Sequence, residues 1–75
     1  MSKLYNEVIR ELREDRDLSQ TDIANLLQIK QTVYSRYERG ANQLPIHHLI
    51  SLCMFYGVSA DYILGLPKGL KYIER

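Results

Sequence analysis

Polar side chains recur at helical spacing between residues 31 and 39, and all of them can form hydrogen bonds. At about 100° per residue, one arc of a helix over this segment holds Gln31, Thr32, Ser35, Arg36 and Arg39. Glutamine can form a bidentate pair with adenine, arginine can form one with guanine, and the threonine methyl group can contact thymine. This arc is therefore suited to reading base edges. The alternative interpretation is a polar helix face that needs only to be solvated.

The opposite arc of the same segment, with Val33, Tyr34 and Tyr37, is predicted to pack against the rest of the domain. Tyr56 also falls on an apolar stripe, so we expect these three tyrosines in the core rather than stacked on single-stranded bases. Only residues 28–30 separate this segment from the helix expected before it, which leaves room for nothing but a tight turn. A helix pair joined in this way can place its second helix in a groove of DNA.

Apolar periodicity and capping residues predict five short helices that would position this segment. Ser19, with Asp22 three residues later, forms an acidic variant of the capping box. Gly40 is suited to end the third helix, and Pro45 is expected in the first turn of the fourth, which Gly57 closes. The predicted helices cover residues 3–15 with Ser2 as a cap, 20–27, 31–39, the stretch from Pro45 to Gly57, and the stretch from Ser59 to Gly65.

Length and charge limit what the chain can be. It has 75 residues, of which 45% are hydrophobic, so a single domain with one modest core is expected. Its single cysteine, Cys53, excludes an internal disulfide. The net charge is only +1, but residues 30–39 carry Lys30, Arg36 and Arg39 against Glu38 alone. Positive charge is thus concentrated on the segment that holds the polar arc, as nucleic-acid binding requires.

The sequence shows no residues characteristic of several other classes of function. No apolar run approaches the ~20 residues needed to cross a bilayer, and no signal peptide is evident, so we expect no membrane contact and a cytoplasmic location. No nucleophile with a base and no carboxylate constellation is evident, and residues 65–69 lack the pattern of a phosphate-binding loop. We therefore expect neither an enzyme nor a cofactor. The adjacent His47 and His48 would point ~100° apart on a helix, which favours surface histidines over a metal site.

Three runs of residues resemble those of one known family. They are LSQTDIANLL at 18–27, YSRYERG at 34–40 with Gln31 before it, and GVSADYILG at 57–65. Over residues 4–65 the chain resembles the phage-repressor and Cro-like helix-turn-helix family, also called the XRE family. The resemblance implies an all-α, five-helix, lambda-repressor-like DNA-binding domain over residues 1–65, whose second and third helices form the helix-turn-helix. Residues 66–75 would be a C-terminal tail that joins a dimer interface, adds a strand or stays disordered.

The resemblance also implies roles for individual positions. Base-reading residues would be Gln31, Thr32, Ser35 and Arg36. Phosphate contacts would come from Gln20, Lys30, Arg39, Asn42 and Gln43. A structural ion pair that orients the third helix would join Arg13 to Glu38, and a dimer interface would include Ala60 and Tyr62.

Two positions depart from the family pattern. Gln28 stands where glycine is usual in the turn, so we expect either a positive φ at a residue that bears a side chain or a slightly different turn. Lys30 stands where serine or threonine often caps the third helix, which removes about 1 kcal/mol of capping but places a positive charge near phosphate. These departures concern the pose of the third helix rather than the motif itself.

Apolar residues late in the chain exceed what five short helices obviously need. The surplus comprises Ile46, Ile50, Met54, Phe55, Tyr62, Leu66, Leu70, Tyr72 and Ile73. These residues either complete the core or form a subunit interface. The second option follows from the resemblance, because such proteins commonly bind as two-fold dimers to pseudo-palindromic sites with half-sites ~34 Å apart.

The sequence therefore predicts a sequence-specific regulator of transcription that binds double-stranded DNA. We expect a homodimeric repressor that acts by occupying an operator, in a bacterium, a phage or a mobile element. The alternative is a protein-interaction module or an antitoxin that uses the same fold and binds DNA weakly, because the net charge is modest and apolar residues are in surplus.

Overall fold

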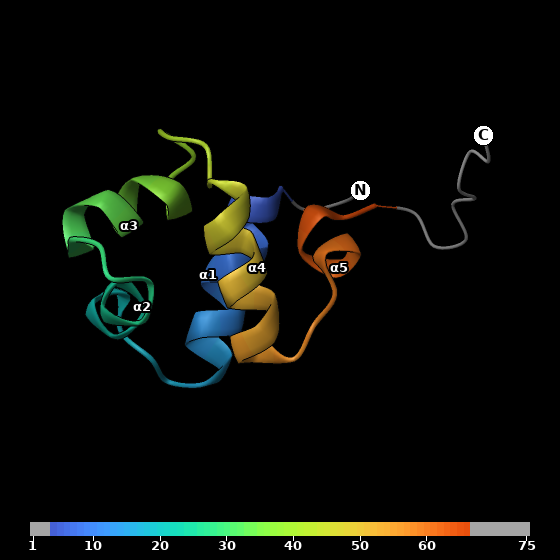
Figure 1. The fold of residues 1–75 in the computed structure, drawn as a ribbon, viewed down its shortest axis with the longest axis horizontal. Helices are drawn as coiled ribbons and strands as arrows, with labels where there is room; N and C mark the ends of the chain where they lie inside the picture. The colour runs from blue at the N-terminus through green and yellow to red at the C-terminus, as the bar shows by residue number, and fades with distance from the viewer. Residues whose placement is uncertain (1–3, 67–75) are drawn as a thin grey trace.

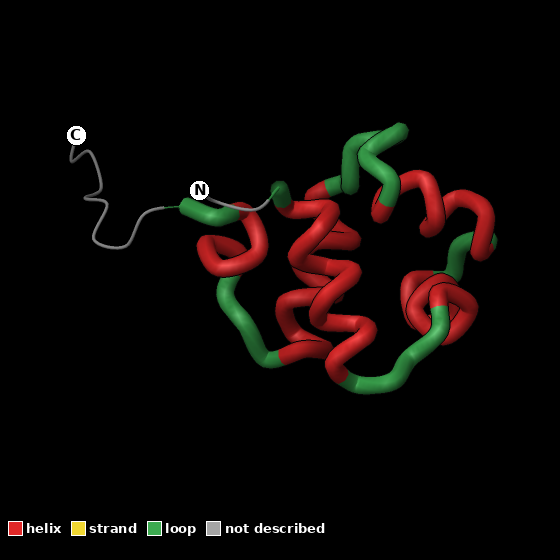
Figure 2. The backbone as a smooth tube through the Cα atoms, turned by 180° about the vertical axis from the view of Figure 1, so that it is seen from behind, coloured by secondary structure: helices red, strands yellow, loops and turns green. Residues whose placement is uncertain are grey.

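The computed structural model describes residues 4–66, which form five helices and no strand (Figure 1). The helices are α1 (Tyr5–Asp15), α2 (Gln20–Leu27), α3 (Gln31–Glu38), α4 (Ile46–Tyr56) and α5 (Ala60–Leu64). In both views α1 and α4 overlap at the centre, with α2 and α3 on one side and α5 on the other (Figures 1 and 2). The predicted all-α class with five helices is confirmed.

The core takes one fully buried large side chain from each helix. In the order α1 to α5, these residues are Ile9, Ile23, Tyr34, Leu52 and Ile63. Tyr37 and Tyr56 are also buried, which confirms that the three tyrosines predicted for the core belong to it. Because every helix contributes to one cluster, the burial of these side chains holds α3 in place against the other helices.

Capping residues begin or end several helices where the sequence predicts. Ser19 Oγ accepts a hydrogen bond from the Asp22 amide at 3.0 Å, and Asp22 Oδ2 accepts one from the Ser19 amide at 2.9 Å, which completes the capping box. Gly57 ends α4 in the left-handed conformation with φ of 70°. Gly40 has φ of 75° shortly after α3.

The start of α1 differs from the prediction. The helix begins at Tyr5, and Leu4 precedes it with extended backbone. The Leu4 amide donates to Glu7 Oε1 at 3.1 Å, so an acidic side chain of the first turn satisfies it. The predicted cap Ser2, and residue 3, lie outside the described residues.

Two further helix ends lie one residue from their predicted positions. Pro45 precedes α4 instead of lying in its first turn, because its ψ of 149° is extended. Arg39 follows α3 instead of ending it, because its ψ of −7° already departs from regular helix toward the turn at Gly40. Of the tail predicted at residues 66–75, only Leu66 lies in the described part of the chain.

The prediction of two surface histidines is wrong for one of them. His48 is only 9% exposed, and its ring centroid lies 6.1 Å from that of Tyr37, whereas His47 is exposed. The error has a physical reason. α4 contains no Asp, Glu, Lys or Arg, so the sequence offers no charged stripe that would mark which side of this helix is buried.

The surplus apolar residues do not complete the core. The exposed ones are Ile46, Ile50, Met54, Phe55, Tyr62 and Leu66. A subunit interface remains the prediction for them, and Leu70, Tyr72 and Ile73 lie outside the described residues. Within residues 4–66, no helix combines the length and the apolar character needed to span a membrane. The same residues contain no group of three or more His, Cys, Asp or Glu placed to hold a metal ion.

Candidate nucleic-acid interface

A tight turn at residues 28–30 joins α2 to α3. The Ile29 amide donates to the Ala24 carbonyl at 2.9 Å, and the Gln28 amide donates to the Asn25 carbonyl at 3.2 Å, which are the two bonds of a Schellman motif. Gln28 has φ of 59° and ψ of 43°, so of the two alternatives expected for this position the structure has the positive φ. A side chain in this conformation costs roughly 1–2 kcal/mol, which the packed helix pair must offset.

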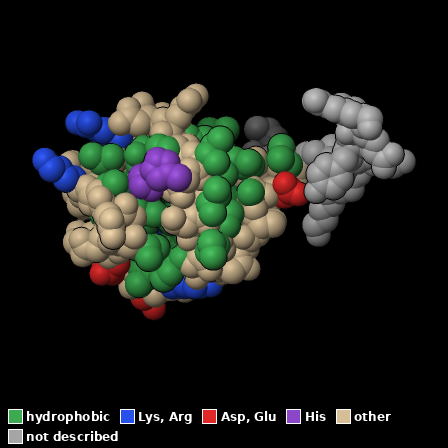
Figure 3. Space-filling view, in the orientation of Figure 1, with side chains coloured by type: hydrophobic (Ala, Val, Ile, Leu, Met, Phe, Trp, Pro, Cys, Tyr) green, Lys and Arg blue, Asp and Glu red, His purple; other side chains and the backbone are tan. Residues whose placement is uncertain are grey.

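The exposed face of α3 is the predicted polar arc. Gln31, Thr32, Arg36 and Arg39 are exposed, and Ser35 is half-buried. Glu38 is the only acidic residue between positions 23 and 45, and its side chain is 3% exposed. The exposed surface of α3 is therefore polar and cationic, with no carboxylate on it. Figure 3 shows Lys and Arg side chains projecting at this end of the molecule.

An ion pair between Glu38 and Arg13 fastens the end of α3 to α1. Arg13 Nε donates to Glu38 Oε2 at 2.7 Å, and Arg13 Nη2 donates to Glu38 Oε1 at 3.0 Å, so the pair is bidentate. Arg13 Nη1 also donates to the Leu18 carbonyl at 2.8 Å. Asn6 Nδ2 donates to the Glu38 backbone carbonyl at 3.1 Å, a contact that no sequence pattern indicated. The structure thus brings together the two residues for which the resemblance implies an ion pair.

The surroundings of the ion pair keep both of its members charged. Burial alone raises the pKa of the Glu38 carboxyl, but hydrogen bonds, that of Arg13 foremost, hold this pKa below its ordinary value. The hydrogen bond to Glu38 raises the pKa of Arg13. The Tyr34 hydroxyl is buried nearby, and burial raises its pKa far above the ordinary value.

Two glutamines connect the ion pair to the exposed face of α3. Gln20 Nε2, at the start of α2, donates to Glu38 Oε1 at 3.0 Å. Gln31 Nε2, at the start of α3, donates to Gln20 Oε1 at 2.6 Å. The sequence predicts Gln20 only as a phosphate contact. Its place between Glu38 and Gln31 has no local signal, because these bonds join residues 18 and 11 positions apart.

The other predicted contact residues lie at two ends of the molecule. Asn42 and Gln43 are exposed in the loop after α3, where the Asn42 amide donates to the Arg36 carbonyl at 3.3 Å. Ala60 is half-buried and Tyr62 is 59% exposed on α5, on the far side of the molecule from α3 (Figure 1). The structure therefore separates the residues expected to contact DNA from those expected at a dimer interface.

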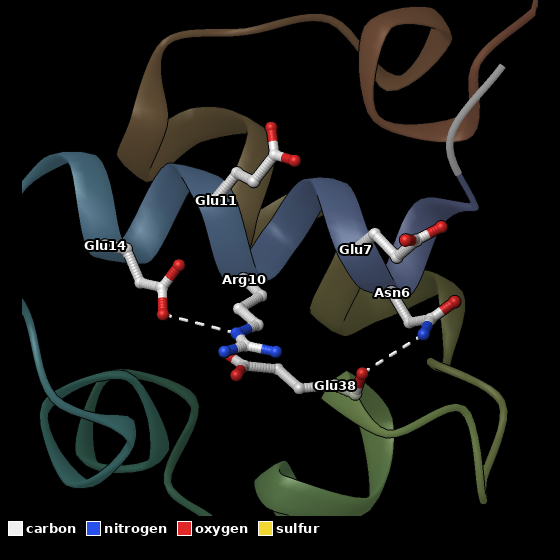
Figure 4. Close-up of a pocket in the computed structure, with 6 residues that line it drawn as sticks. All are labelled: Asn6, Glu7, Arg10, Glu11, Glu14 and Glu38. Carbon is white, nitrogen blue, oxygen red and sulfur yellow. Dashed lines mark hydrogen bonds and ion pairs between the residues drawn. The ribbon is translucent and has the colours of Figure 1, made fainter. Parts of the chain in front are cut away.

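A hollow of about 300 Å³ lies beside Glu38, between α1 and the end of α3 (Figure 4). Its lining consists of Asn6, Glu7, Arg10, Glu11, Glu14 and Glu38. Arg10 Nε donates to Glu14 Oε2 at 3.2 Å, and acidic residues predominate in the lining. A carboxylate-rich wall repels phosphate, so this hollow is no part of the candidate interface.

Comparison with known families agrees with this geometry. A family model described as Helix-turn-helix matches residues 9–63. This chain belongs to the helix-turn-helix family. In its helix-turn-helix, α2 and α3 are the two helices and residues 28–30 are the turn. The sequence predicted a helix-turn-helix of the phage-repressor and Cro-like type, and the relatives of this chain confirm that prediction.

Two curated relatives and one solved structure illustrate the match. The uncharacterized HTH-type transcriptional regulator YobD of Bacillus subtilis is 35% identical over 63 residues, which are 84% of this chain and 56% of the relative. The cryptic phage CTXphi transcriptional repressor RstR of Vibrio cholerae is 34% identical over 55 residues, which are 73% of this chain and 50% of the relative. The chain thus spans about half the length of these curated relatives.

The solved structure is that of the P22 c2 repressor protein in complex with a synthetic operator. It superposes with a TM-score of 0.76 at 24% identity, covering 84% of this chain and 96% of that one. This likeness confirms the predicted lambda-repressor-like fold for the helix-turn-helix domain described here.

Proposed function

We propose that this chain is a sequence-specific regulator of transcription that binds double-stranded DNA and represses by occupying an operator. One observation carries the proposal: α3 exposes hydrogen-bonding and cationic side chains, while its only carboxylate is buried against Arg13. A polyanion attracts such a surface, and an exposed acid on it would oppose binding. The relatives, a transcriptional regulator and a phage repressor, support the proposal, as does the operator complex of the P22 protein.

In this proposal α3 enters the major groove and the surrounding residues hold the phosphate backbone. The base-reading residues are Gln31, Thr32, Ser35 and Arg36. The phosphate contacts are Gln20, Lys30, Arg39, Asn42 and Gln43. No cofactor takes part. Base contacts supply selectivity, while phosphate contacts set the register of the protein on the duplex.

The proposal also includes a homodimer on a pseudo-palindromic operator. Ala60 and Tyr62 lie at the α5 end, away from α3, which leaves the reading face free when a second copy pairs there. Two copies related by a two-fold axis would read half-sites ~34 Å apart.

Selection from a pool of random duplexes at near-physiological salt tests the function. We expect enrichment of an inverted repeat. On the enriched duplex, Arg36→Ala should weaken binding by about 1–3 kcal/mol and relax selectivity at one base pair of each half-site. Arg10→Ala is the matched control, because Arg10 lies on α1 and pairs with Glu14 rather than facing outward from α3. Unchanged affinity and base preference in Arg36→Ala would disprove the assignment of the reading face.

A second candidate function is a protein-interaction module or an antitoxin. The exposed apolar side chains of α4 favour it, since Ile46 is 74% and Met54 is 80% exposed. This candidate predicts that no duplex is enriched, and that any residual DNA binding hardly changes with salt, because few phosphate contacts release counterions.

A further inference from the structure

The loop that joins α3 to α4, residues 39–45, is attached to the first turn of α1. The Leu44 amide donates to the Tyr5 hydroxyl oxygen at 3.2 Å. Asn6 Nδ2 donates to the Glu38 backbone carbonyl, directly before the loop, at 3.1 Å (Figure 4). Tyr5 and Asn6 are half-buried neighbours in the sequence. One turn of α1 therefore holds the loop near both of its ends.

Two exposed side chains, those of Asn42 and Gln43, lie between fixed points of this loop. On one side, the Asn42 amide donates to the Arg36 carbonyl at 3.3 Å, so α3 holds the backbone there. On the other side, the bond from Leu44 to Tyr5 holds the backbone, and Leu44 is half-buried against the core. The backbone of these two residues is therefore fixed by α3 before it and by α1 after it.

Asn42 and Gln43 are neutral, and this makes their contacts depend on the position of the backbone. An amide N–H holds a phosphate oxygen only at a hydrogen-bond distance of ~2.7–3.2 Å and in nearly linear geometry. A charged side chain such as Arg39 attracts phosphate over a longer range. In the proposed complex, the loop follows the helix that enters the groove and lies beside the phosphates that border it. A displaced loop would therefore lose the amide contacts before the contact of Arg39.

We propose that Tyr5, by accepting the hydrogen bond of the Leu44 amide, is a positioning residue that holds Asn42 and Gln43 at the phosphate backbone of the bound duplex. The inference rests on the proposed function, because it requires the loop to meet DNA. Tyr5 itself does not contact the duplex. Its hydroxyl fixes the loop before DNA arrives, so the loop loses less conformational freedom on binding. Tyr5 thus contributes to affinity for every duplex and to no base preference.

Tyr5→Phe tests this role, because it removes the hydroxyl and keeps the ring. We expect affinity to fall roughly 3- to 10-fold, as for the loss of one hydrogen bond. The fall should be equal on the selected duplex and on an unrelated one. The salt dependence of the binding constant should stay the same, because neutral contacts release no counterions.

Two further variants bracket this result. Arg39→Ala is the contrast, because the loss of a cationic contact should reduce the steepness of log K against log salt by about 0.9. Ser51→Ala is the matched control, because it also removes a hydroxyl that is bonded to the backbone. Ser51 Oγ donates to the His47 carbonyl on α4 at 3.1 Å, outside the loop, so affinity should not change in this variant.

A double-mutant cycle separates positioning from a general loss of stability. Asn42→Ala/Gln43→Ala should weaken binding, and the addition of Tyr5→Phe should weaken it no further. A full effect of Tyr5→Phe without the two amides would overturn the positioning role. Unchanged affinity in Asn42→Ala/Gln43→Ala would overturn it too, while the proposed function stands on the base contacts of α3. If the unsubstituted protein retains no duplex, the proposed function fails and this role with it.

A measurement without DNA tests the hydrogen bond itself in the unsubstituted chain. Backbone hydrogen exchange, followed by nuclear magnetic resonance, should be slower at the Leu44 amide than at the Gln43 amide, to which the structure gives no hydrogen-bond partner within residues 4–66. Equal exchange at the two amides would overturn the proposal, even if Tyr5→Phe failed to fold.

Discussion

Two regions of this molecule, the exposed faces of α3 and of α4, have opposite kinds of surface. At the α3 end the exposed face is polar and cationic, and Glu38 is buried against Arg13. Over the middle of the molecule, α4 contains no Asp, Glu, Lys or Arg, and Ile46 and Met54 are mostly exposed. Figure 3 shows apolar side chains gathered over the middle of the molecule, where α4 faces the viewer.

Each of these two regions departs from the usual distribution of charged and apolar residues. A buried carboxylate is tolerated only when it is paired and hydrogen-bonded, and an exposed apolar side chain forgoes about 25 cal/mol for each Å² that stays in water. The contrast teaches that the two surfaces suit different partners. A cationic face without acids fits DNA, whereas an uncharged apolar face fits another protein surface, such as a second copy of this chain.

The largest expected effect concerns the buried carboxylate at the α3 end. In Arg13→Met, Glu38 would stay buried without its ion-pair partner, so we expect a loss of about 3–5 kcal/mol in the free energy of unfolding. Urea denaturation followed by circular dichroism measures this loss. Arg10→Met is the control, since the pair of Arg10 with Glu14 is exposed and should contribute about 1 kcal/mol at most. Equal losses in the two variants would show that burial of Glu38 does not depend on Arg13.

An intermediate effect is expected at the exposed apolar side chains of α5 and α4. Tyr62→Glu places a charge on an exposed site of α5, so the free energy of unfolding should change by no more than about 0.5 kcal/mol. If two copies pair there, affinity for the full inverted repeat should fall roughly 5- to 150-fold, with affinity for a single half-site unchanged. Titrations of both duplexes measure the difference. Met54→Glu serves as the comparison on α4, and a fall in this variant alone would move the interface from α5 to α4.

The smallest effect is expected in the pH dependence of the free energy of unfolding, to which His48 and Glu38 contribute in different pH ranges. Burial, with a lesser contribution from His47, lowers the pKa of His48 below its ordinary value of 6.5. The unfolded chain therefore takes up a proton before the folded one, so stability is full above about pH 6.5 and declines as the pH falls below it. Glu38 has a lowered pKa too, so its contribution is present above about pH 4.5 and is lost only in stronger acid.

Histidines titrate roughly between pH 7.5 and pH 5. Thermal unfolding over this range should show the decline in stability that we assign to His48. His48→Phe keeps a ring against Tyr37 and should flatten this decline, whereas His47→Gln should leave most of it. A decline of the same size in His48→Phe would assign it to another group.

Sequence patterns predicted those features whose cause is local. The capping box of Ser19 and Asp22, the left-handed Gly57 and the two faces of α3 depend on residues a few positions apart, and all three are found in the structure. The positive φ of Gln28 was one of two expectations, because the family resemblance places a turn glycine at this position, and the structure has it. The burial of His48 could not be predicted, because α4 has no charged stripe that marks its inner side.

The amino-acid sequence by itself determined the five helices, the family, and the polar arc that α3 exposes. Only the tertiary structure decided how the glutamines are held, because Glu38, Gln20 and Gln31 come from the ends of two helices and meet only after the core has packed. It also decided that Ile46, Ile50 and Met54 face solvent rather than the core. The physical reason is the same in both cases: hydrogen-bond direction and burial depend on neighbours brought together by folding, whereas helix ends and periodicity depend on neighbours along the chain.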